Sequence, residues 1–356
     1  MKQRNNKRKK TKTLRCYTRS LMARPHLLIS APEDLFDSFF SGRELQRLDR
    51  MFAWERVAGS KISAKFRRPL RTADAMITTW DSPRFDHTLV SQAPRLRIIA
   101  HCGGEVKSRF PRSLFERLTI TNAPEPMARA TAELGAALLL YCSRNVDFYR
   151  TELRKASNRI YEKVHLYGTS ESLVGRTVAM IGFGRIGRAL VDLLRGFDLN
   201  WLVHDPFSDR TLARRYPVRF VALEELLAEA HLLVLAAALT DDTRGILAKA
   251  NLAKLPDGAA IINIARGGLI NLQDLKQEVK RGRLRCAIDV TDPLEPLPVN
   301  DPLRRMPGAI VTPHIAGSGR QVRQEIARVV LEDLEKFFRS NRVDNRVTPE
   351  MLDRMT

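Results

Sequence analysis

Short apolar runs alternate with longer segments of helical spacing along most of the chain. A brief apolar run between turn residues is typical of a strand buried on both faces, as in a parallel sheet. Apolar positions that recur every three or four residues predict helices for residues 33–50 and 85–92. This alternation predicts an α/β fold with parallel sheets. In the first third of the chain, the predicted strands are residues 26–30, 54–57, 75–79, 96–101 and 119–121.

The same alternation continues after a long apolar helix that is predicted for residues 128–141. Pro124 and Pro126 precede this helix, and we interpret the proline-marked turn as a domain boundary. A final helix is predicted for residues 322–338. We expect two parallel-sheet domains, the second (residues 124–315) inserted into a discontinuous first domain (residues 25–123 and 316–350). The strands predicted for the second domain include residues 178–181, 201–203, 259–264, 286–290 and 309–311.

One unit, residues 178–206, combines a strand, a glycine-rich turn, a helix, a second strand and an acidic residue. Gly182, Gly184 and Gly187 have G-x-G-x-x-G spacing. The first glycine allows a tight turn, the second lets a pyrophosphate approach the backbone, and the third allows close packing of helix on sheet. The N-terminus of the helix attracts a diphosphate. The unit therefore predicts a dinucleotide-binding site.

Asp205 ends the second strand of this unit, where a carboxylate accepts hydrogen bonds from the adenine ribose hydroxyls. A carboxylate there repels a 2′-phosphate, which favours NAD over NADP. Arg210, Arg214 and Arg215 follow closely and weaken that discrimination.

Three later predicted strands each end in a residue with useful chemistry. Arg266 follows the strand at 259–264, Asp289 ends the strand at 286–290, and His314 follows the strand at 309–311. Ligands bind at the carboxyl ends of the strands in open α/β sheets. An arginine, a carboxylate and a histidine in one crevice are a set of groups suited to hydride transfer with an anionic substrate.

Together these segments resemble the D-isomer-specific 2-hydroxyacid dehydrogenases that use NAD. The resemblance spans roughly residues 95–320 and implies a two-domain enzyme, usually dimeric. It implies that residues 124–315 form the Rossmann domain that binds NAD, and that both chain ends form a flavodoxin-like substrate domain. The matching segments are residues 182–187 with Asp205, 263–268, 289–290, 295–298 and 313–314, and the weaker matches are residues 239–243 and 121–124.

The resemblance also implies roles for single residues. His314 becomes the acid/base that protonates the ketone oxygen, Glu295 its partner, and Arg266 the group that holds the substrate carboxylate. Asp289 matches a position that usually contacts the nicotinamide amide, or else only positions the following loop. The implied cofactor-binding residues are Gly182, Gly184, Arg185, Ile186, Gly187, Asp205, Ala265 and Asp289, and the implied carboxylate-binding loop is Gly103, Gly104, Glu105 and Val106.

Some positions depart from the family pattern. Leu294 is an extra residue before Glu295, which leaves Asp292 as a possible substitute for that glutamate. His231 replaces an aspartate that is often found before the strand that leads to Leu239 and Thr240. Relatives usually carry a histidine and a proline where this chain has Ala236, Ala237 and Ala238, so the nicotinamide end faces a changed wall.

Composition limits the class of protein. The 356 residues are 44% hydrophobic and 28% charged, which predicts a soluble globular chain with room for two domains. No apolar run approaches the roughly 18 residues of a membrane span. Four widely separated cysteines without a C-x-x-C pair argue against a zinc site or disulfides, and favour a reducing cytoplasm.

Residues 1–24 contain ten Lys and Arg side chains and no acid, which is half of the formal charge of +20. Such a tail cannot bury apolar surface, and we expect it to be disordered. It either binds nucleic acid by counterion release or is an incidental extension ahead of a start at Met22. A basic, acid-free start also weakly resembles an organelle transit peptide.

The leading hypothesis is a cytoplasmic, dimeric NAD-dependent oxidoreductase. It interconverts a small D-2-hydroxy acid and its 2-keto acid, as glyoxylate and hydroxypyruvate reductases do, without a metal. The alternative is an NAD(H)-sensing scaffold similar to the C-terminal-binding-protein corepressors, with little turnover. The substrate pocket depends on side chains of the first domain, of which Trp80 is one candidate, with a place in the core as the equal alternative.

Overall fold

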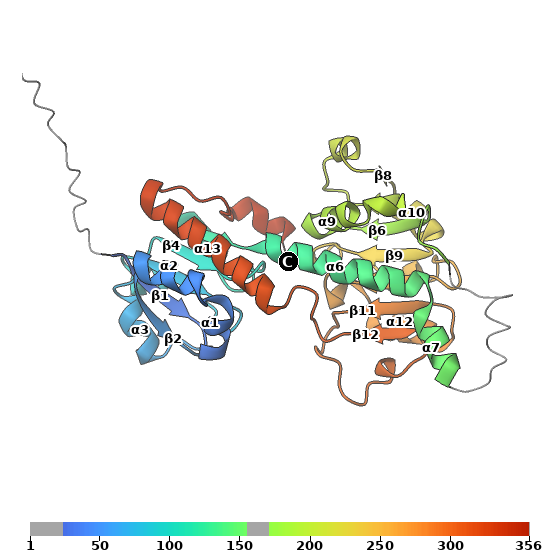
Figure 1. Ribbon diagram of the computed structural model, residues 1–356, viewed down its shortest axis with the longest axis horizontal. Coiled ribbons are helices and arrows are strands. Elements are labelled where there is room, and N and C mark those ends of the chain that lie inside the picture. Colours follow the sequence, from blue (N-terminus) through green and yellow to red (C-terminus); the bar gives the residue numbers. More distant parts are fainter. Residues whose placement is uncertain (1–23, 155–170, 356) are drawn as a thin grey trace, which may run out of the picture.

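Two parallel sheets organise the computed structural model, which describes residues 24–154 and 171–355 (Figure 1). The first sheet has five strands in the order β2-β1-β3-β4-β5, and every neighbouring pair is parallel. This order changes direction between β1 and β3, at whose carboxyl ends ligands are expected. The strands are β1 (His26–Ser30), β2 (Ala53–Val57), β3 (Ala75–Thr78), β4 (Ile98–His101) and β5 (Thr119–Asn122).

The second sheet has seven strands in the order β12-β11-β10-β9-β6-β7-β8, again all parallel. The α/β fold with two parallel sheets is therefore confirmed. The strand β8 was not expected, because three residues carry too little apolar pattern to be recognised. The strands are β6 (Thr177–Ile181), β7 (Asn200–His204), β8 (Val218–Phe220), β9 (Leu232–Leu235), β10 (Ala260–Asn263), β11 (Arg285–Ile288) and β12 (Ala309–Val311).

The single helix predicted for residues 33–50 is wrong, because the chain forms two helices there. α1 (Glu33–Phe39) and α2 (Arg43–Met51) are separated at Gly42, whose φ of 52° is left-handed and ends the helical path. The helix predicted for 85–92 is reduced to α4 (Leu89–Gln92). Two short helices were missed, α3 (Ala64–Leu70) and α5 (Arg112–Arg117).

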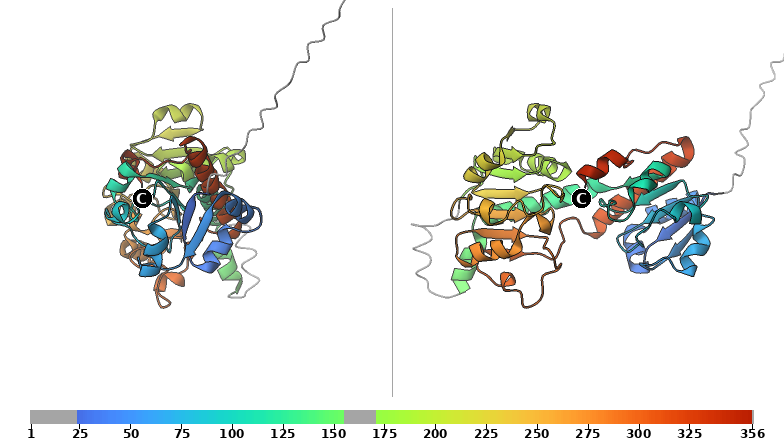
Figure 2. Two further views of the ribbon diagram at one scale, coloured as in Figure 1. Left: turned by 90° about the vertical axis from the view of Figure 1, so that its left-hand side faces the viewer. Right: turned by 180° about the vertical axis from the view of Figure 1, so that it is seen from behind.

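The long helix α6 (Pro124–Ser143) begins earlier than predicted. Pro124 and Pro126 lie inside its first turn rather than in a turn before it, since the first turn of a helix does not need their missing N–H groups. α6 packs against α9 (Arg185–Leu193) of the second domain and against α13 (Arg320–Ser340) of the first. Figures 1 and 2 show it running from one domain into the other.

The remaining helices lie mainly around the second sheet. They are α7 (Val146–Arg154), α10 (Leu223–Glu229), α11 (Lys249–Leu252) and α12 (Leu272–Lys280). Five short 3-10 helices complete the described elements: η1 (Arg195–Phe197), η2 (Arg210–Arg214), η3 (Gly267–Leu269), η4 (Pro302–Arg304) and η5 (Pro349–Arg354).

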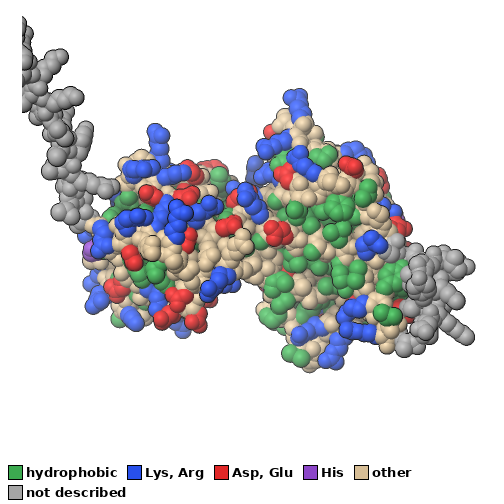
Figure 3. Space-filling model, viewed as in Figure 1, with side chains coloured by type: hydrophobic (Ala, Val, Ile, Leu, Met, Phe, Trp, Pro, Cys, Tyr) green, Lys and Arg blue, Asp and Glu red, His purple; other side chains and the backbone are tan. Residues whose placement is uncertain are grey.

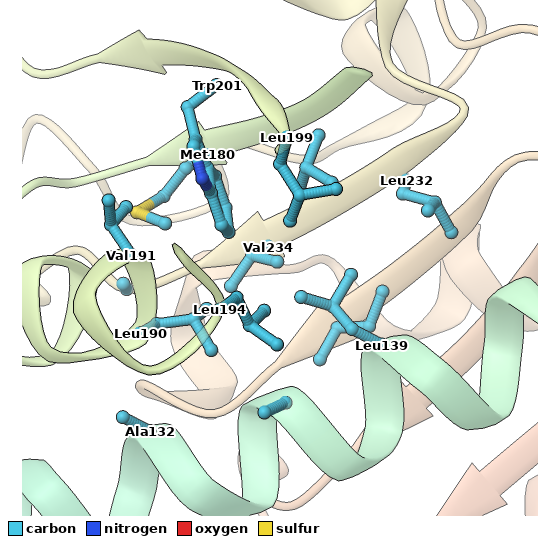
Figure 4. Packing of buried hydrophobic residues seen from close by; sticks show 14 of the residues in the cluster. Ala132, Leu139, Met180, Leu190, Val191, Leu194, Leu199, Trp201, Leu232 and Val234 are labelled. Atoms are coloured by element: carbon cyan, nitrogen blue, oxygen red, sulfur yellow. The ribbon is translucent and has the colours of Figure 1, made fainter. Parts of the chain in front are cut away.

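The core of the second domain lies between its sheet and the pair α6 and α9. Figure 4 shows Leu139 of α6 and Leu190 and Leu194 at α9 converging on Met180 and Val234 of the sheet. Burial of each such side chain stabilises the domain by about 1.5–3 kcal/mol. This packing fixes where α9 begins, which is next to the glycine-rich turn.

The first domain reaches slightly further than residue 350. Val347 and Leu352 are buried in its core, so the chain after α13 returns to the first sheet. The basic segment predicted to be disordered lies outside the described residues, apart from Arg24. Over the described part of the surface, Lys and Arg side chains are spread over both domains (Figure 3).

Within residues 24–154 and 171–355, no helix has both the length and the apolar character needed to cross a membrane. The cysteines described there, Cys102, Cys142 and Cys286, are free and buried.

Two leucines of α9 test this packing. Leu190 is fully buried, and its replacement by alanine should lower the free energy of unfolding by about 2–5 kcal/mol. Leu193, which is 50% exposed on the same helix, is the matched control. Leu193→Ala should change the free energy of unfolding by less than about 0.5 kcal/mol. Urea unfolding followed by circular dichroism measures both. Equal losses in the two variants would contradict the packing.

Candidate active site

The glycine-rich turn joins β6 to α9 as the sequence predicts. Gly182 has a φ of 91°, and a Cβ there would lie 2.4 Å from Cα of Ala237, so no other residue fits. A Cβ on Gly187 would lie 2.8 Å from Sδ of Met180, which explains the close packing of α9 on the sheet. Gly184 has open space beside it at the N-terminus of α9. Arg185 and Ile186 follow it, and their N–H groups have no partner within the helix.

The carboxylate of Asp205 organises the same turn. Its Oδ2 accepts a hydrogen bond from the N–H of Phe183 at 2.7 Å. Its Oδ1 accepts from the N–H groups of Phe207 and Ser208 at 2.9 and 3.0 Å. Asp205 thus connects the glycine-rich turn to the loop after β7, a role that sequence reasoning missed. Oδ2 accepts one hydrogen bond, so its second lone pair remains available for a ribose hydroxyl.

A cavity of about 990 Å³ lies over the turn. Gly182, Gly184 and Asp205 line it, together with Ala236, Ala237 and Ala238. The glycine turn therefore packs directly against the alanine wall noted in the sequence. The open glycine turn, the free N-terminus of α9 and the carboxylate are the features that a dinucleotide needs, so these residues fit NAD(H).

Arg266 follows β10 in a loop with little freedom. The side-chain amide of Asn263 donates to the carbonyl of Arg266 at 2.9 Å and accepts from the N–H of Ala265 at 3.1 Å. A Cβ on Gly267 would lie 2.2 Å from the carbonyl carbon of Thr291, so the loop touches the backbone after β11. Burial lowers the pKa of the Arg266 guanidinium, while Glu105 and Glu295 raise it. The charge of Arg266 is therefore favoured by acidic groups of both domains, Glu105 of the first and Glu295 of the second.

The predicted pair of His314 and Glu295 is present. Nδ1 of His314 lies 2.8 Å from Oε2 of Glu295, and Oε1 of Glu295 accepts a hydrogen bond from the N–H of Thr291 at 3.1 Å. His314 has a φ of 55°, an uncommon left-handed conformation that clusters at functional sites.

The extra residue before Glu295 is accommodated at the surface. Leu294 is 58% exposed, so the loop places its additional length in solvent and keeps Glu295 against His314. The carboxylate of Asp292 lies 3.8 Å from Arg244 instead. Glu295, and not Asp292, is therefore the partner of His314.

Asp289 holds the segment that carries His314. Its carboxylate is buried and accepts hydrogen bonds from the Thr312 hydroxyl at 2.5 Å and from the N–H groups of Ile315 and Ala316 at 2.9 and 2.8 Å. Its carbonyl accepts from the N–H of His314 at 2.9 Å. The geometry gives Asp289 the alternative role considered above, that of positioning a loop. Contact with the nicotinamide amide stays a prediction.

The loop after β4 brings the first domain to this site. The carbonyl of Gly103 accepts from the N–H of Ala123, and the carbonyl of Gly104 accepts from the side chain of Asn122. The carboxylate of Glu105 accepts hydrogen bonds from Ser108, and its charge raises the pKa of Arg266 in the second domain. Among the described residues, the N–H groups of Gly104, Glu105 and Val106 have no acceptor. They are free to bind an anion.

His101 lies beneath this loop and was not identified from the sequence, where an isolated histidine at a strand end carries no signal. It is fully buried, and its Nδ1 lies 2.9 Å from Oγ1 of Thr78. Its Nε2 has no hydrogen-bond partner among the described residues. A Cβ on Gly103 would lie 2.8 Å from this Nε2 and 3.0 Å from Nε1 of Trp80. Trp80 therefore lies beside the loop, and its place in the substrate pocket stays a prediction.

Over the described ranges, no cluster of three or more His, Cys, Asp or Glu side chains is arranged to hold a metal ion.

The buried histidine has a pH signature. Burial lowers the pKa of His101 to about 3, with a further decrease caused by Arg109. Because the unfolded-state pKa is about 6.5, the neutral imidazole stabilises the fold fully above pH 6.5 and progressively less as the pH falls toward 3. The free energy of unfolding should therefore fall below pH 6.5 by up to about 1.4 kcal/mol per pH unit from this group.

His101→Gln removes the titrating group and should flatten the fall measured by urea unfolding between pH 7 and pH 5. His231→Gln, at an exposed position, is the control and should keep the wild-type slope. A His101→Gln slope equal to that of the wild type would show that His101 does not stay neutral in the fold.

Comparison with known proteins agrees with this geometry. Residues 136–316 match the family model described as D-isomer specific 2-hydroxyacid dehydrogenase, NAD binding domain. A hydroxypyruvate reductase from Thermotoga maritima is 31% identical over 257 residues, 70% of this chain and 79% of that protein. A crystal structure of a Thermus thermophilus protein is 30% identical, with a TM-score of 0.73, and the match covers 91% of this chain and all of that one.

A D-3-phosphoglycerate dehydrogenase from Archaeoglobus fulgidus is 28% identical over 266 residues. That match covers 74% of this chain but 49% of the relative, so the chain spans about half the length of that protein. Because the family model covers half of the chain and falls on the domain with the glycine-rich turn, NAD(H) is the cofactor that this domain is built to bind. The chain belongs to the family of D-isomer specific 2-hydroxyacid dehydrogenases.

Proposed function

We propose that this protein is an NAD-dependent oxidoreductase that interconverts a small D-2-hydroxy acid and its 2-keto acid. The observation that carries the proposal is the His314–Glu295 pair, which lies with Arg266 in the segments that follow β10, β11 and β12 of the second sheet. Relatives named hydroxypyruvate reductase and glyoxylate reductase support a substrate of that size.

Arg266 binds the substrate carboxylate. Its guanidinium can form two parallel hydrogen bonds to a carboxylate, and its partly buried position strengthens them because less water competes. The free N–H groups of Gly104, Glu105 and Val106 bind the same carboxylate from the other domain. The substrate therefore lies between the two domains, with its carbonyl directed toward His314.

His314 transfers the proton. Glu295 accepts a hydrogen bond from Nδ1–H, which fixes the ring so that Nε2 faces the crevice. When the keto acid is reduced, the Nε2 proton moves to the ketone oxygen, and Glu295 stabilises the imidazolium before that transfer. Bound NADH supplies the hydride to the carbonyl carbon. In the reverse direction, His314 takes the hydroxyl proton.

The biological unit in this proposal is a homodimer in the cytoplasm. The dimer is implied by the family resemblance, and the free, buried cysteines support a reducing compartment.

An NAD(H)-sensing scaffold is the second candidate function. The observation that favours it is the alanine wall, Ala236, Ala237 and Ala238, which gives the dinucleotide cavity small apolar side chains where relatives carry a histidine and a proline. Such a protein binds NADH and associates with a partner in response, but has negligible turnover.

Replacing the acid/base pair separates the two candidates. His314→Ala and Glu295→Gln should slow hydride transfer from NADH to glyoxylate or hydroxypyruvate by about 10²–10⁴-fold, because the proton donor or its support is lost. Single-turnover absorbance at the NADH band measures the rate, and fluorescence titration should show unchanged NADH affinity. Asp292→Ala, in the same loop, is the control and should retain most of the rate. Equal loss of NADH binding, or a normal rate, would contradict these roles.

The carboxylate-binding role of Arg266 is tested by Arg266→Lys. Lysine keeps the charge but loses the paired hydrogen bonds, so KM for the keto acid should rise about 10–100-fold. Arg281→Lys, at an exposed position after α12, should leave KM unchanged. A normal KM in Arg266→Lys would exclude paired recognition of the carboxylate by Arg266.

A further inference from the structure

The last residues of the chain connect the two domains. η5 (Pro349–Arg354) follows the return to the first sheet, and its Leu352 is buried in the core of the first domain. Oδ1 of Asp353 lies 2.9 Å from a guanidinium nitrogen of Arg112 in α5. The backbone of η5 is therefore attached to the first domain.

The side chains that follow Leu352 reach the second domain. Asp353 and Arg354 line the same cavity as Gly182, Gly184 and Asp205. Figures 1 and 2 show the C-terminus at the junction of the two domains. The dinucleotide cavity is thus made of residues from both domains, although the family model that matches this chain ends at residue 316.

Arg354 lies at the end of that cavity where Asp205 is expected to bind the adenine ribose. Its guanidinium carbon lies 5.7 Å from the centroid of the Phe207 ring, within the range of a cation–π contact. Phe207 is 60% exposed and donates its N–H to Asp205, the carboxylate expected at the adenine ribose. Among the described residues, Arg354 forms no ion pair, so its charge is not neutralised by a carboxylate.

The free charge fits the ligand of this cavity. A dinucleotide has an anionic diphosphate and a flat adenine ring, and an arginine interacts with both, through its charge and through the face of its guanidinium. Four acids of the described ranges line the cavity. Asp205 accepts hydrogen bonds from backbone N–H groups, Asp209 accepts from Thr211, and Asp353 pairs with Arg112. Asp242 is the fourth. In the part of the chain that the structure describes, none of these four carboxylates forms an ion pair with Arg354, so the charge of the arginine is available to an anionic ligand.

We propose that Arg354 is a cofactor-binding residue, which with Phe207 closes over the adenosine end of the dinucleotide. This inference rests on the proposed use of NAD(H) and adds a contact from the C-terminal segment to the residues of the glycine-rich unit. Because η5 is attached to the first domain, bound cofactor links the two domains through Arg354.

The test is calorimetric titration of the full chain with ADP-ribose, which carries the adenosine half of the cofactor without the nicotinamide. Arg354→Ala should raise the Kd about tenfold, because a charge and a stacking face are lost. Arg354→Lys should recover part of the affinity, since it restores the charge alone. Arg342→Ala is the matched control, because it removes an exposed cation of the same terminal region outside the cavity, and should leave the Kd within twofold.

The outcomes distinguish failure of the Arg354 proposal from failure of the proposed function. If the wild type binds neither ADP-ribose nor NADH, the proposed function fails. If the wild type binds ADP-ribose and Arg354→Ala binds it equally well, the inference alone is overturned. If Arg354→Ala loses affinity for NADPH but not for ADP-ribose or NADH, the inference is also overturned, because Arg354 then contacts a 2′-phosphate instead. Arg354 is exposed, and a thermal unfolding curve like that of the wild type confirms that the variant is folded.

The Phe207 contact provides a second measurement. In a double-mutant cycle with Phe207→Ala, the losses in ADP-ribose affinity should be non-additive, because each variant removes half of one contact. Additive losses would show that Arg354 and Phe207 act separately and would overturn the shared closure.

Discussion

The buried carboxylate of Asp289 determines where the His314–Glu295 pair lies. A charge removed from water is costly unless it is fully hydrogen-bonded, and three donors from residues 312–316 satisfy this one. Those donors pull the loop after β12 against the end of β11 and hold His314 in its left-handed conformation. His314 in turn reaches Glu295, whose other oxygen is held by the backbone of Thr291. His314, the proton donor of the proposed function, is thus positioned by a chain of contacts that ends in one buried acid.

In the proposed function, parts of both domains hold the cofactor and the substrate. Arg266 and the His314–Glu295 pair come from the second domain, whereas the free N–H groups after β4 come from the first. The dinucleotide cavity follows the same rule, since Arg354 enters it from a segment whose Leu352 is packed in the first domain. The helix α6 packs on α9 of the second domain and on α13 of the first, and so connects the two domains. Ligands that touch both domains can therefore stabilise one relative arrangement of them.

Much of this was predictable from the sequence, and the failures have physical causes. The three glycines and Asp205 were recognisable because their spacing follows from the geometry of one strand, one turn and one helix. The break at Gly42 was missed because helical apolar spacing continues on both sides of it. His101, and the second role of Asp205, depend on contacts between distant segments, which no local pattern records. The reach of Arg354 into the cavity depends on how the last helix returns to the first sheet, which the sequence does not reveal.

The most direct test of the account is whether the wild-type protein oxidises NADH in the presence of small 2-keto acids. A panel of glyoxylate, hydroxypyruvate, pyruvate and bulkier branched acids, followed at the NADH absorbance band, also ranks the size of the substrate pocket. The account predicts turnover with at least one of the small acids and formation of the D-hydroxy acid. NADH binding without turnover on any acid in the panel would contradict it and favour the sensing scaffold.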